Sequence, residues 1–383
     1  MPDPLRLLLW HWGRRGGGPR YTHELARVLA ARDDVEVHLS LSRQSEYFDV
    51  TDSLGLPAHH IDTYANLPQF ALRSMSLPLI RRELGRYIAR HRIEVVFCTM
   101  DHLWDAFVAP EIGRRGALYL LAVHDANRHP GEDQGFRQWL LRRDVACADG
   151  AVTLTRSVGE GLVTSHAFPP DRVWKSTLGS FAYTGRTTPR TLPKDRPPRL
   201  LFFGRILPYK GLDLMLEALP ALQKRFPGLT LEVWGSGDLA PHRRRLDGLS
   251  GVRLENRWIG EDEIPHIFAD TDLAVLPYRE ASQSAVVATA FSDAMPCVAT
   301  PLPGLREQVT DGRDGIVASA AGAEAFAAAV TRALEDDTRY AALSAGALET
   351  AATQLDWRPI GDTIADAAFA LRRIGPRRKG VDH

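Results

Sequence analysis

The residues best suited to chemistry lie in the stretch Arg199 to Leu216, where two cations occupy one short loop. The apolar run Leu200 to Phe203 has the length of a buried parallel strand, and it stops at Gly204. Arg205 and Lys210 follow, directly before a leucine-rich stretch with helical spacing. Open α/β sheets bind anions at such a place, where a strand ends and a helix begins. The loop therefore predicts a diphosphate site, although the two cations would also suit a solvated loop.

Two other places combine a strand end with groups that bind ligands. His124 follows the expected strand Leu118 to Val123, and a histidine there either contacts a substrate or is structural. A later helix begins near Ser284, Ala285 and Val286, where small residues and free backbone N–H groups make a second place for an anion.

A run of glycines follows the first expected strand, Leu5 to His11. Gly16, Gly17 and Gly18 either let the backbone approach a ligand closely or make a tight turn. Strand, glycine loop and helix are the usual beginning of a doubly wound domain. The run does not match the glycine pattern of dinucleotide sites, so no such site is predicted here.

A glycine motif in mid-chain does match that pattern. The sequence Gly235-Ser-Gly-Asp-Leu-Ala240 follows an expected strand and has Glu255 twenty residues beyond its first glycine, as a nicotinamide site requires. A short glycine motif is weak evidence, and this one lies inside the larger pattern described below. We do not interpret it as a dehydrogenase site.

Two features near the middle of the second half have alternative interpretations. Arg257 and Trp258 close the strand that ends at Glu255, and a tryptophan there either stacks on a nucleotide base or packs in a core. The triplet Asp270-Thr271-Asp272 precedes the strand beginning at Leu273, at the end away from the proposed ligand. We interpret it as a turn and predict no metal site.

Short apolar runs alternate with helical patterns along the whole chain, which predicts an α/β protein with two parallel, doubly wound sheets. The expected strands are Leu5–His11, Val35–Leu41, Glu94–Thr99, Leu118–Val123, Ala151–Leu154, Leu200–Phe203, Leu229–Trp234, Val252–Glu255, Leu273–Leu276 and Cys297–Ala299. Ala323 to Thr353 is expected to be helical. The predicted domains are 1–184 and 199–356, joined by a linker rich in proline, threonine and basic residues at 185–198 and followed by a terminal helical segment at 357–383.

Composition limits the class of protein. Lys plus Arg equals Asp plus Glu at 47 each among 383 residues, so a general nucleic-acid partner is not expected. The three cysteines, Cys98, Cys147 and Cys297, lie far apart in apolar contexts, as buried thiols do in a reducing compartment. No signal peptide or membrane-spanning run is recognised, which predicts a cytoplasmic protein. Arginines interleave with apolar residues over 73–92, which suits either contact with anionic lipid or a solvated helix face.

The two stretches Phe202-Phe-Gly-Arg-Ile-Leu-Pro-Tyr-Lys-Gly211 and Pro296-Cys-Val-Ala-Thr-Pro-Leu-Pro-Gly-Leu-Arg-Glu307 resemble the large family of retaining glycosyltransferases related to glycogen synthase. The resemblance implies the GT-B fold, with two Rossmann-like domains facing a central cleft and the terminal helix returning to the first domain. It implies that Arg205 and Lys210 grip the donor diphosphate and that His124 contacts the transferred sugar. The glycines Gly17, Gly18 and Gly204 and the pair Arg257 and Trp258 would border the nucleotide sugar.

One departure from the family matters. The family usually has two glutamates with seven residues between them, and their places fall on Ala281 and Thr289. Glu280 lies one residue early and is expected to replace the first, while Thr289 offers a hydroxyl to the ribose.

The predicted function is transfer of a sugar, with retention and without a metal or cofactor, from a nucleoside diphosphate sugar to a glycan or lipid-linked acceptor. Such a reaction fits the assembly of cell-surface polysaccharide or glycolipid at the inner face of the membrane. The alternatives are a non-catalytic protein that binds sugar nucleotides and a GT-B sugar-nucleotide epimerase.

Overall fold

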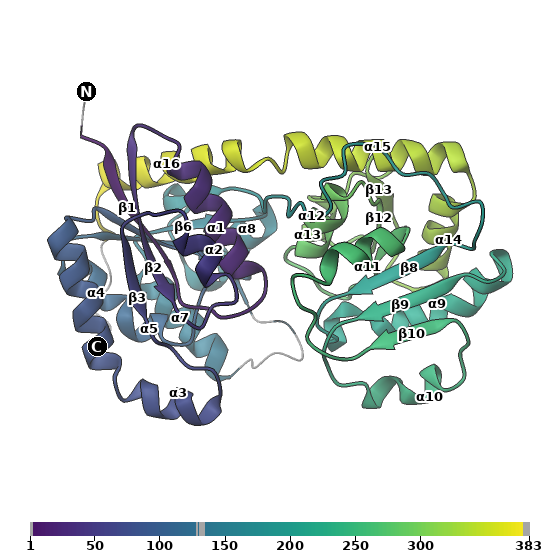
Figure 1. Ribbon diagram of the computed structural model, residues 1–383, viewed down its shortest axis with the longest axis horizontal. Helices are drawn as coiled ribbons and strands as arrows, with labels where there is room; N and C mark the ends of the chain where they lie inside the picture. The colour runs from purple at the N-terminus through teal and green to yellow at the C-terminus, as the bar shows by residue number, and fades with distance from the viewer. Residues whose placement is uncertain (1–2, 128, 130–134, 378–383) are drawn as a thin grey trace. The chain divides into compact units, whose positions relative to one another are not determined.

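The computed structural model describes residues 3–127, 129 and 135–377, which form two compact units (Figure 1). The described residues of 1–128, 133–178 and 357–383 make up the first unit, and those of 129–132 and 179–356 make up the second. Each unit has its own parallel sheet and its own apolar core. The prediction of two doubly wound α/β domains is therefore confirmed.

The described part of the first unit forms a seven-stranded parallel sheet in the order β3-β2-β1-β4-β5-β6-β7. The strand order reverses between β1 and β4, so the loops after these strands leave a crevice of the kind in which open sheets bind ligands. The strands are β1 (Leu5–His11), β2 (Val35–Ser42), β3 (Ala58–Ile61), β4 (Val95–Cys98), β5 (Leu118–Val123), β6 (Gly150–Thr153) and β7 (Val173–Lys175).

Helices cover this sheet, and the last helix of the chain belongs to the same unit. In the described residues they are α1 (Gly17–Leu29), α2 (Phe48–Asp52), α3 (Leu67–Ser74), α4 (Leu77–His91), α5 (Asp105–Val108), α6 (Pro110–Arg114), α7 (Phe136–Cys147), α8 (Arg156–His166) and α16 (Trp357–Ile374). Helix α16 packs on α1 and β6 (Figure 1) and on β5. The ring of Trp357 lies 5.5 Å from that of Tyr21. The amphipathic pattern of α16 thus covers the sheet that begins the chain.

The described part of the second unit forms a six-stranded parallel sheet in the order β10-β9-β8-β11-β12-β13, with the reversal between β8 and β11. The strands are β8 (Arg199–Phe203), β9 (Thr230–Trp234), β10 (Val252–Glu255), β11 (Leu273–Leu276), β12 (Cys297–Ala299) and β13 (Gly315–Val317). The helices are α9 (Leu212–Arg225), α10 (Arg243–Leu246), α11 (Ile264–Asp270), α12 (Ala285–Ser292), α13 (Pro303–Arg306), α14 (Ala323–Leu334) and α15 (Asp337–Thr353).

The ten expected strands are all present, and their ends agree with the structure to within one residue. The sequence analysis missed β3, β7 and β13, each of which lies at an edge of its sheet. Strands β3 and β7 are only partly buried, so no apolar run marks them. The helical stretch from Ala323 divides into α14 and α15, because Asp336 accepts hydrogen bonds from the backbone of Thr338 and Arg339 and begins a new helix. None of the helices in the described residues is long and apolar enough to cross a membrane.

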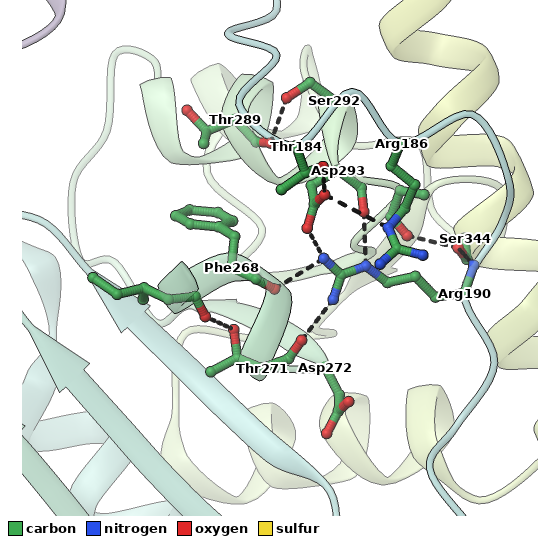
Figure 2. A network of polar contacts seen from close by, with 12 residues as sticks. Thr184, Arg186, Arg190, Phe268, Thr271, Asp272, Thr289, Ser292, Asp293 and Ser344 are labelled. Atoms are coloured by element: carbon green, nitrogen blue, oxygen red, sulfur yellow. Dashed lines mark hydrogen bonds and ion pairs between the residues drawn. The ribbon is translucent and has the colours of Figure 1, made fainter. Parts of the chain in front are cut away.

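The segment 185–198, predicted to be a linker, lies on the second unit, and buried Arg190 is one of the residues that bind it there (Figure 2). The Arg190 guanidinium donates to the backbone oxygens of Asp293 at 2.7 Å, Thr271 at 2.6 Å and Phe268 at 2.9 Å, and it pairs with the Asp293 carboxylate. Burial lowers the pKa of Arg190 to about 10, so it stays charged at neutral pH. Arg190 thereby joins this segment to the loops that precede β11 and β12.

Candidate functional site

The residues predicted to bind the donor diphosphate lie at the carboxyl edge of the second sheet, in the loops after β8 and β11. After β8 the chain turns at Gly204 and makes a 3₁₀ turn at Pro208–Lys210. Gly211 then adopts a left-handed φ of 69°, and a Cβ there would lie 1.9 Å from the carbonyl oxygen of Pro277. A glycine is required at this position, because the β8 loop packs directly on the loop after β11.

Lys210 reaches the start of α12 through a buried tyrosine. Its Nζ donates to the Tyr278 hydroxyl at 2.8 Å and lies 4.1 Å from the centre of that ring. The Tyr278 oxygen is in turn 3.2 Å from Ser284 Oγ. Burial raises the pKa of Tyr278, so the phenol remains neutral and holds the ammonium by a hydrogen bond. The structure therefore brings together Lys210 and Ser284, which the sequence analysis singled out separately.

The amide side chain of Gln308 binds both backbone polar groups of Ser284 at the start of α12. Gln308 accepts from the Ser284 N–H at 2.7 Å and donates to the Ser284 carbonyl at 3.2 Å, while the Ser284 side chain caps no backbone group of the helix. The N–H groups of Ala285 and Val286 lie in the first turn, where intrahelical partners are lacking. Together with the Lys210 ammonium they make a positive site of the kind that binds phosphate. Thr289 lies one turn further along α12 and is buried.

The other two predicted residues of these loops are accessible. Arg205 is exposed in the loop after β8. Glu280 is exposed in the loop after β11, where its carboxylate lies 3.3 Å from Nδ1 of His129. His129 also contacts Ser282 through Nε2 at 3.2 Å and stacks on the Tyr209 ring at 4.7 Å. The sequence analysis missed His129, because nothing in its neighbourhood links it to the donor loops.

Arg257 and Trp258 follow β10, which is separated from β8 by β9. The Arg257 guanidinium is engaged by Glu263, with both oxygens at 2.7 and 2.6 Å, and this contact lowers the pKa of Glu263 to about 2. Trp258 is 40% exposed, so it is not a core residue. To bind a nucleotide as predicted, the Arg257 guanidinium would have to give up part or all of its contact with Glu263.

The glycine motif at 235–240, which matches the dinucleotide-binding pattern and follows β9, has a structural role. Gly235 has a φ of 148°, and a Cβ there would lie 1.8 Å from the carbonyl oxygen of Gly204. The Gly204 N–H donates to Trp234, and the Ile206 N–H donates to Ser236. The glycine thus allows the loops after β8 and β9 to run side by side, as the donor loop requires.

The acidic triplet before β11 is part of the fold. Asp272 accepts from both guanidinium nitrogens of Arg196, at 2.7 and 2.9 Å, and from the Arg199 backbone N–H at 2.8 Å. Across the residues that the structure describes, no group of three or more His, Cys, Asp or Glu side chains is arranged to hold a metal ion.

In the first unit, His124 lies at the carboxyl edge next to the strand reversal. It is 7% exposed, and its Nε2 donates to the Thr99 carbonyl at 2.9 Å. Thr99 Oγ1 is 2.6 Å from Thr22 Oγ1 of α1, so the ends of β4 and β5 and the start of α1 are joined. The neutral tautomer that donates from Nε2 leaves Nδ1 as an acceptor.

Gly17 and Gly18 were predicted to lie in a loop, and this is wrong, because both lie in the first turn of α1. The turn begins early because the backbone of Gly18 lies against the ring of His11, where a Cβ would come within 2.7 Å of the ring. Burial lowers the pKa of His11 to about 4, so this ring is neutral at pH 7. Sequence analysis missed His11 as a site residue, although its place at the end of β1 was visible.

Comparison with known proteins connects both units to one group. Residues 16–174 match the family described as "Glycosyl transferase 4-like domain", and residues 197–336 match "Glycosyl transferases group 1". The D-inositol 3-phosphate glycosyltransferase of Nocardioides sp. is 31% identical over 389 residues, covering 88% of this chain and 82% of that protein. The GDP-mannose-dependent alpha-(1-6)-phosphatidylinositol monomannoside mannosyltransferase of Mycolicibacterium smegmatis is 29% identical over 388 residues, covering 94% and 96%.

Solved structures show the same fold at lower identity. Anabaena HepE in complex with UDP superposes with a TM-score of 0.72 at 17% identity, covering 96% of this chain and all of that one. The sucrose-phosphate synthase of Thermosynechococcus elongatus gives a TM-score of 0.71, also at 17% identity, covering 97% of this chain and all of that one.

Proposed function

The chain belongs to the group 1 glycosyltransferases of the GT-B fold, which transfer sugars from nucleotide sugars, and from this premise we propose a retaining, metal-independent reaction on a nucleoside diphosphate sugar. The observation that carries the proposal is the linkage of Lys210, Tyr278 and Ser284 at the edge of the second sheet. It places an ammonium beside the N-terminus of α12, where a departing diphosphate would be stabilised.

In this proposal the protein supplies the charge stabilisation. Lys210 and Arg205 bind the diphosphate as it leaves, and the first N–H groups of α12 accept part of its charge. His124 and Glu280 act on the sugar, whose transition state has oxocarbenium character. Gly17, Gly18, Gly204 and Thr289 border the nucleotide sugar, and Arg257 and Trp258 lie toward the base. The configuration at the transferred carbon is retained, as the resemblance to the glycogen-synthase-related family implies.

The names of related proteins indicate which classes of donor and acceptor to test first. The mannosyltransferase of Mycolicibacterium smegmatis uses GDP-mannose, and HepE binds UDP, so guanine and uracil donors are the first to test. The two curated relatives act on inositol phosphate and phosphatidylinositol compounds. We propose that the acceptor of this chain is likewise a hydroxylated glycan or lipid-linked molecule used in assembling the cell surface.

Incubation with a panel of nucleotide sugars and no acceptor tests the proposed activity. Slow hydrolysis of one donor, with a thermal shift from the matching nucleoside diphosphate, is the expected outcome. Epimerised donor would instead identify an epimerase. Binding without any turnover, in the presence of inositol and lipid acceptors as well, would identify a non-catalytic binding protein.

The surface of the segment 73–92 supports the proposal that the acceptor lies at a membrane surface. One stripe of α4 packs into the core of the first unit, while three large apolar side chains, in α3, in the turn after it and in α4, are at least 62% exposed. Exposed arginines accompany them, a combination typical of helices that lie on anionic lipid. The exposed residues are Leu72, Met75 and Leu79, with Arg73, Arg82, Arg86 and Arg90.

Cosedimentation with vesicles of phosphatidylcholine and phosphatidylglycerol at low salt tests the membrane contact. The triple variant Arg82→Ala, Arg86→Ala, Arg90→Ala should bind about a hundredfold more weakly, since each cation adds about 1 kcal/mol near an anionic surface. Arg243→Ala with Arg244→Ala, on the exposed face of α10, is the matched control. Failure of the parent protein to cosediment would contradict the membrane contact and favour an acceptor free in solution.

A further inference from the structure

The first unit contains a cavity of about 100 Å³ that the donor chemistry does not use. It lies beneath the loop after β4, between that loop and α7. A buried water needs about 10–15 Å³ on this measure, so the cavity has room for several hydroxyl-sized groups. Its lining residues are Tyr64, Asp101, His102, Leu103, Ala106, Arg137, Leu140, Leu141 and Asp144.

Two of the lining side chains have buried polar atoms without a partner among the described residues. Asp144 is 2% exposed, and its Oδ1 accepts from the Tyr119 hydroxyl at 2.9 Å, whereas its Oδ2 has no hydrogen bond. His102 likewise has a buried Nε2 with no partner. Unsatisfied buried polar atoms are rare, since each costs about 1–3 kcal/mol, and two on one cavity wall make that wall suited to a hydrogen-bonding ligand.

The donor and acceptor roles of these two atoms are fixed by their neighbours. The Trp104 backbone N–H points to Nδ1 of His102 at 3.4 Å, so Nδ1 is the acceptor and Nε2 carries the hydrogen in the neutral ring. Burial lowers the pKa of His102 to about 3, which keeps the ring neutral. The wall of the cavity therefore offers one hydrogen-bond donor, His102 Nε2–H, and the Asp144 carboxyl, whose Oδ2 is an acceptor when the group is ionised, above about pH 7.

The charges around the cavity select the kind of group that enters it. Asp101, and Asp144 above about pH 7, would repel a phosphate or carboxylate inside the cavity, whereas Arg137, the cation of the lining, is exposed to solvent. An ammonium group would leave the His102 N–H without an acceptor. A hydroxyl group accepts from one and donates to the other. The ring of Tyr64, packed against Phe70 at 4.8 Å and Trp104 at 5.4 Å, supplies an apolar wall for the carbon face of such a ligand.

We infer that this cavity is the subsite in which an uncharged, hydroxylated ring of the acceptor binds, a sugar or a cyclitol held by Asp144 and His102. The inference rests on the proposed function and deepens it, since it names the chemistry of the acceptor part that the protein recognises. Any charged group of the acceptor then lies outside the cavity, toward the exposed Arg137.

Titration of the protein with myo-inositol, methyl mannoside and glucosamine, followed by calorimetry, tests the subsite. The two neutral polyols should bind more tightly than glucosamine, and Asp144→Asn should weaken them tenfold or more. This variant keeps an oxygen for the Tyr119 hydroxyl. Ala106→Leu, which fills the cavity while leaving both polar groups, should abolish polyol binding. Asp366→Asn, an exposed carboxylate of α16, is the control for loss of charge.

Donor hydrolysis separates this inference from the proposed function. Asp144→Asn and Ala106→Leu should hydrolyse donor and bind nucleoside diphosphate as the parent does, while kcat/KM for transfer to the acceptor falls. Unchanged polyol affinity and unchanged acceptor kcat/KM in both folded variants would overturn the subsite, and would mean that the cavity holds only water. If the parent protein itself hydrolyses none of the donors, the proposed function is refuted.

Discussion

At the scale of single residues, Nε2 of His124 is hydrogen-bonded within the protein, whereas Nδ1 has no protein partner among the described residues and can bind a ligand. Nε2 donates to the Thr99 carbonyl, which fixes the ring, and Nδ1 is left as an acceptor. Because His124 and Lys210 belong to different units, their effects on sugar and nucleotide should separate. We predict that His124→Ala lowers kcat for donor hydrolysis by tenfold or more, since general acid–base groups contribute about 10²–10⁴, while the Kd for nucleoside diphosphate stays unchanged.

His166→Ala is the matched control for that prediction. His166 also donates its Nε2 to a backbone oxygen, that of Ala126 at 2.7 Å, but it ends α8 away from the strand reversal. Steady-state kinetics and calorimetry on both variants separate the roles. A large loss of nucleotide affinity in folded His124→Ala would show that the residue serves the nucleotide.

At the scale of elements, Arg190 helps to bind the segment 185–198, which precedes β8, to the second unit. Its three backbone contacts and its ion pair with Asp293 lie inside the second unit, where water does not replace them (Figure 2). Removing one partner of a buried ion pair costs about 3–5 kcal/mol. Arg190→Met should therefore lower the melting temperature of the second unit by several degrees or more, and calorimetric melting with and without nucleoside diphosphate assigns the transition.

Arg244→Met provides the control for the loss of an arginine, because Arg244 is exposed on α10. It should melt as the parent does. Parent-like melting of Arg190→Met would contradict the anchoring role, and the segment would then be a linker in the ordinary sense.

The elements that the sequence predicts well are those with long apolar runs. Leu200 to Phe203 and Leu118 to Val123 are read correctly because a central parallel strand is buried on both faces. The short edge strand Ala58–Ile61 is half-buried and carries two histidines, so no run marks it. Long-range contacts are also invisible in a single sequence. The Lys210 to Tyr278 hydrogen bond and the Gly211 approach to Pro277 join loops that are far apart along the chain.

The polar cavity of the first unit was missed for a similar reason. Asp144 lies in α7 with no strand end or glycine nearby, and its partner Tyr119 comes from β5. His102 and Asp101 follow β4, where the strand-end rule would have singled them out. The sequence analysis applied that rule only to loops with glycine, basic residues or the motif of the resembling family.

At the scale of the whole molecule, the buried titratable groups of the first unit control stability against pH. Burial raises the pKa of Asp144 to about 7, whereas an unfolded chain loses this proton near pH 4. Between these values the folded state holds the extra proton, so its free energy of unfolding falls as pH rises. The charged and titratable groups around Asp144 are Tyr119 on β5, Asp105 on α5, Cys98 on β4, and Asp101 and His102 in the loop after β4.

Asp144→Asn should gain stability relative to the parent as pH rises from about 4 to 7, by about 1.4 kcal/mol per pH unit for one proton. Buried His11 and His59, whose pKa values are lowered to about 4, produce the opposite slope in both proteins. The difference between the two curves therefore reports Asp144 together with Asp105, whose pKa the Asp144 charge helps to raise. Melting temperatures measured across this pH range provide the comparison. Parallel curves, such as those expected for Asp366→Asn, would show that Asp144 is ionised in the folded protein.

At the scale of the whole molecule, the second unit is the proposed place where a nucleoside diphosphate leaves its sugar. The two halves of the chain each match a glycosyltransferase family, and the strand reversal of the second sheet lies beside Lys210 and the start of α12. If these groups stabilise the leaving diphosphate, their contribution is larger in the transition state than in the bound donor.

Donor hydrolysis by Lys210→Ala and Arg205→Ala beside the parent tests this claim most directly. We predict that each folded variant loses about a hundredfold in kcat, near 3 kcal/mol, and binds nucleoside diphosphate more weakly but bare nucleoside equally well. Lys194→Ala, an exposed lysine of the same unit, should be unchanged, and Tyr278→Phe should lose less than Lys210→Ala if the ammonium acts on the diphosphate. Near-parent rates in both Lys210→Ala and Arg205→Ala would contradict the diphosphate site and the proposed mechanism with it.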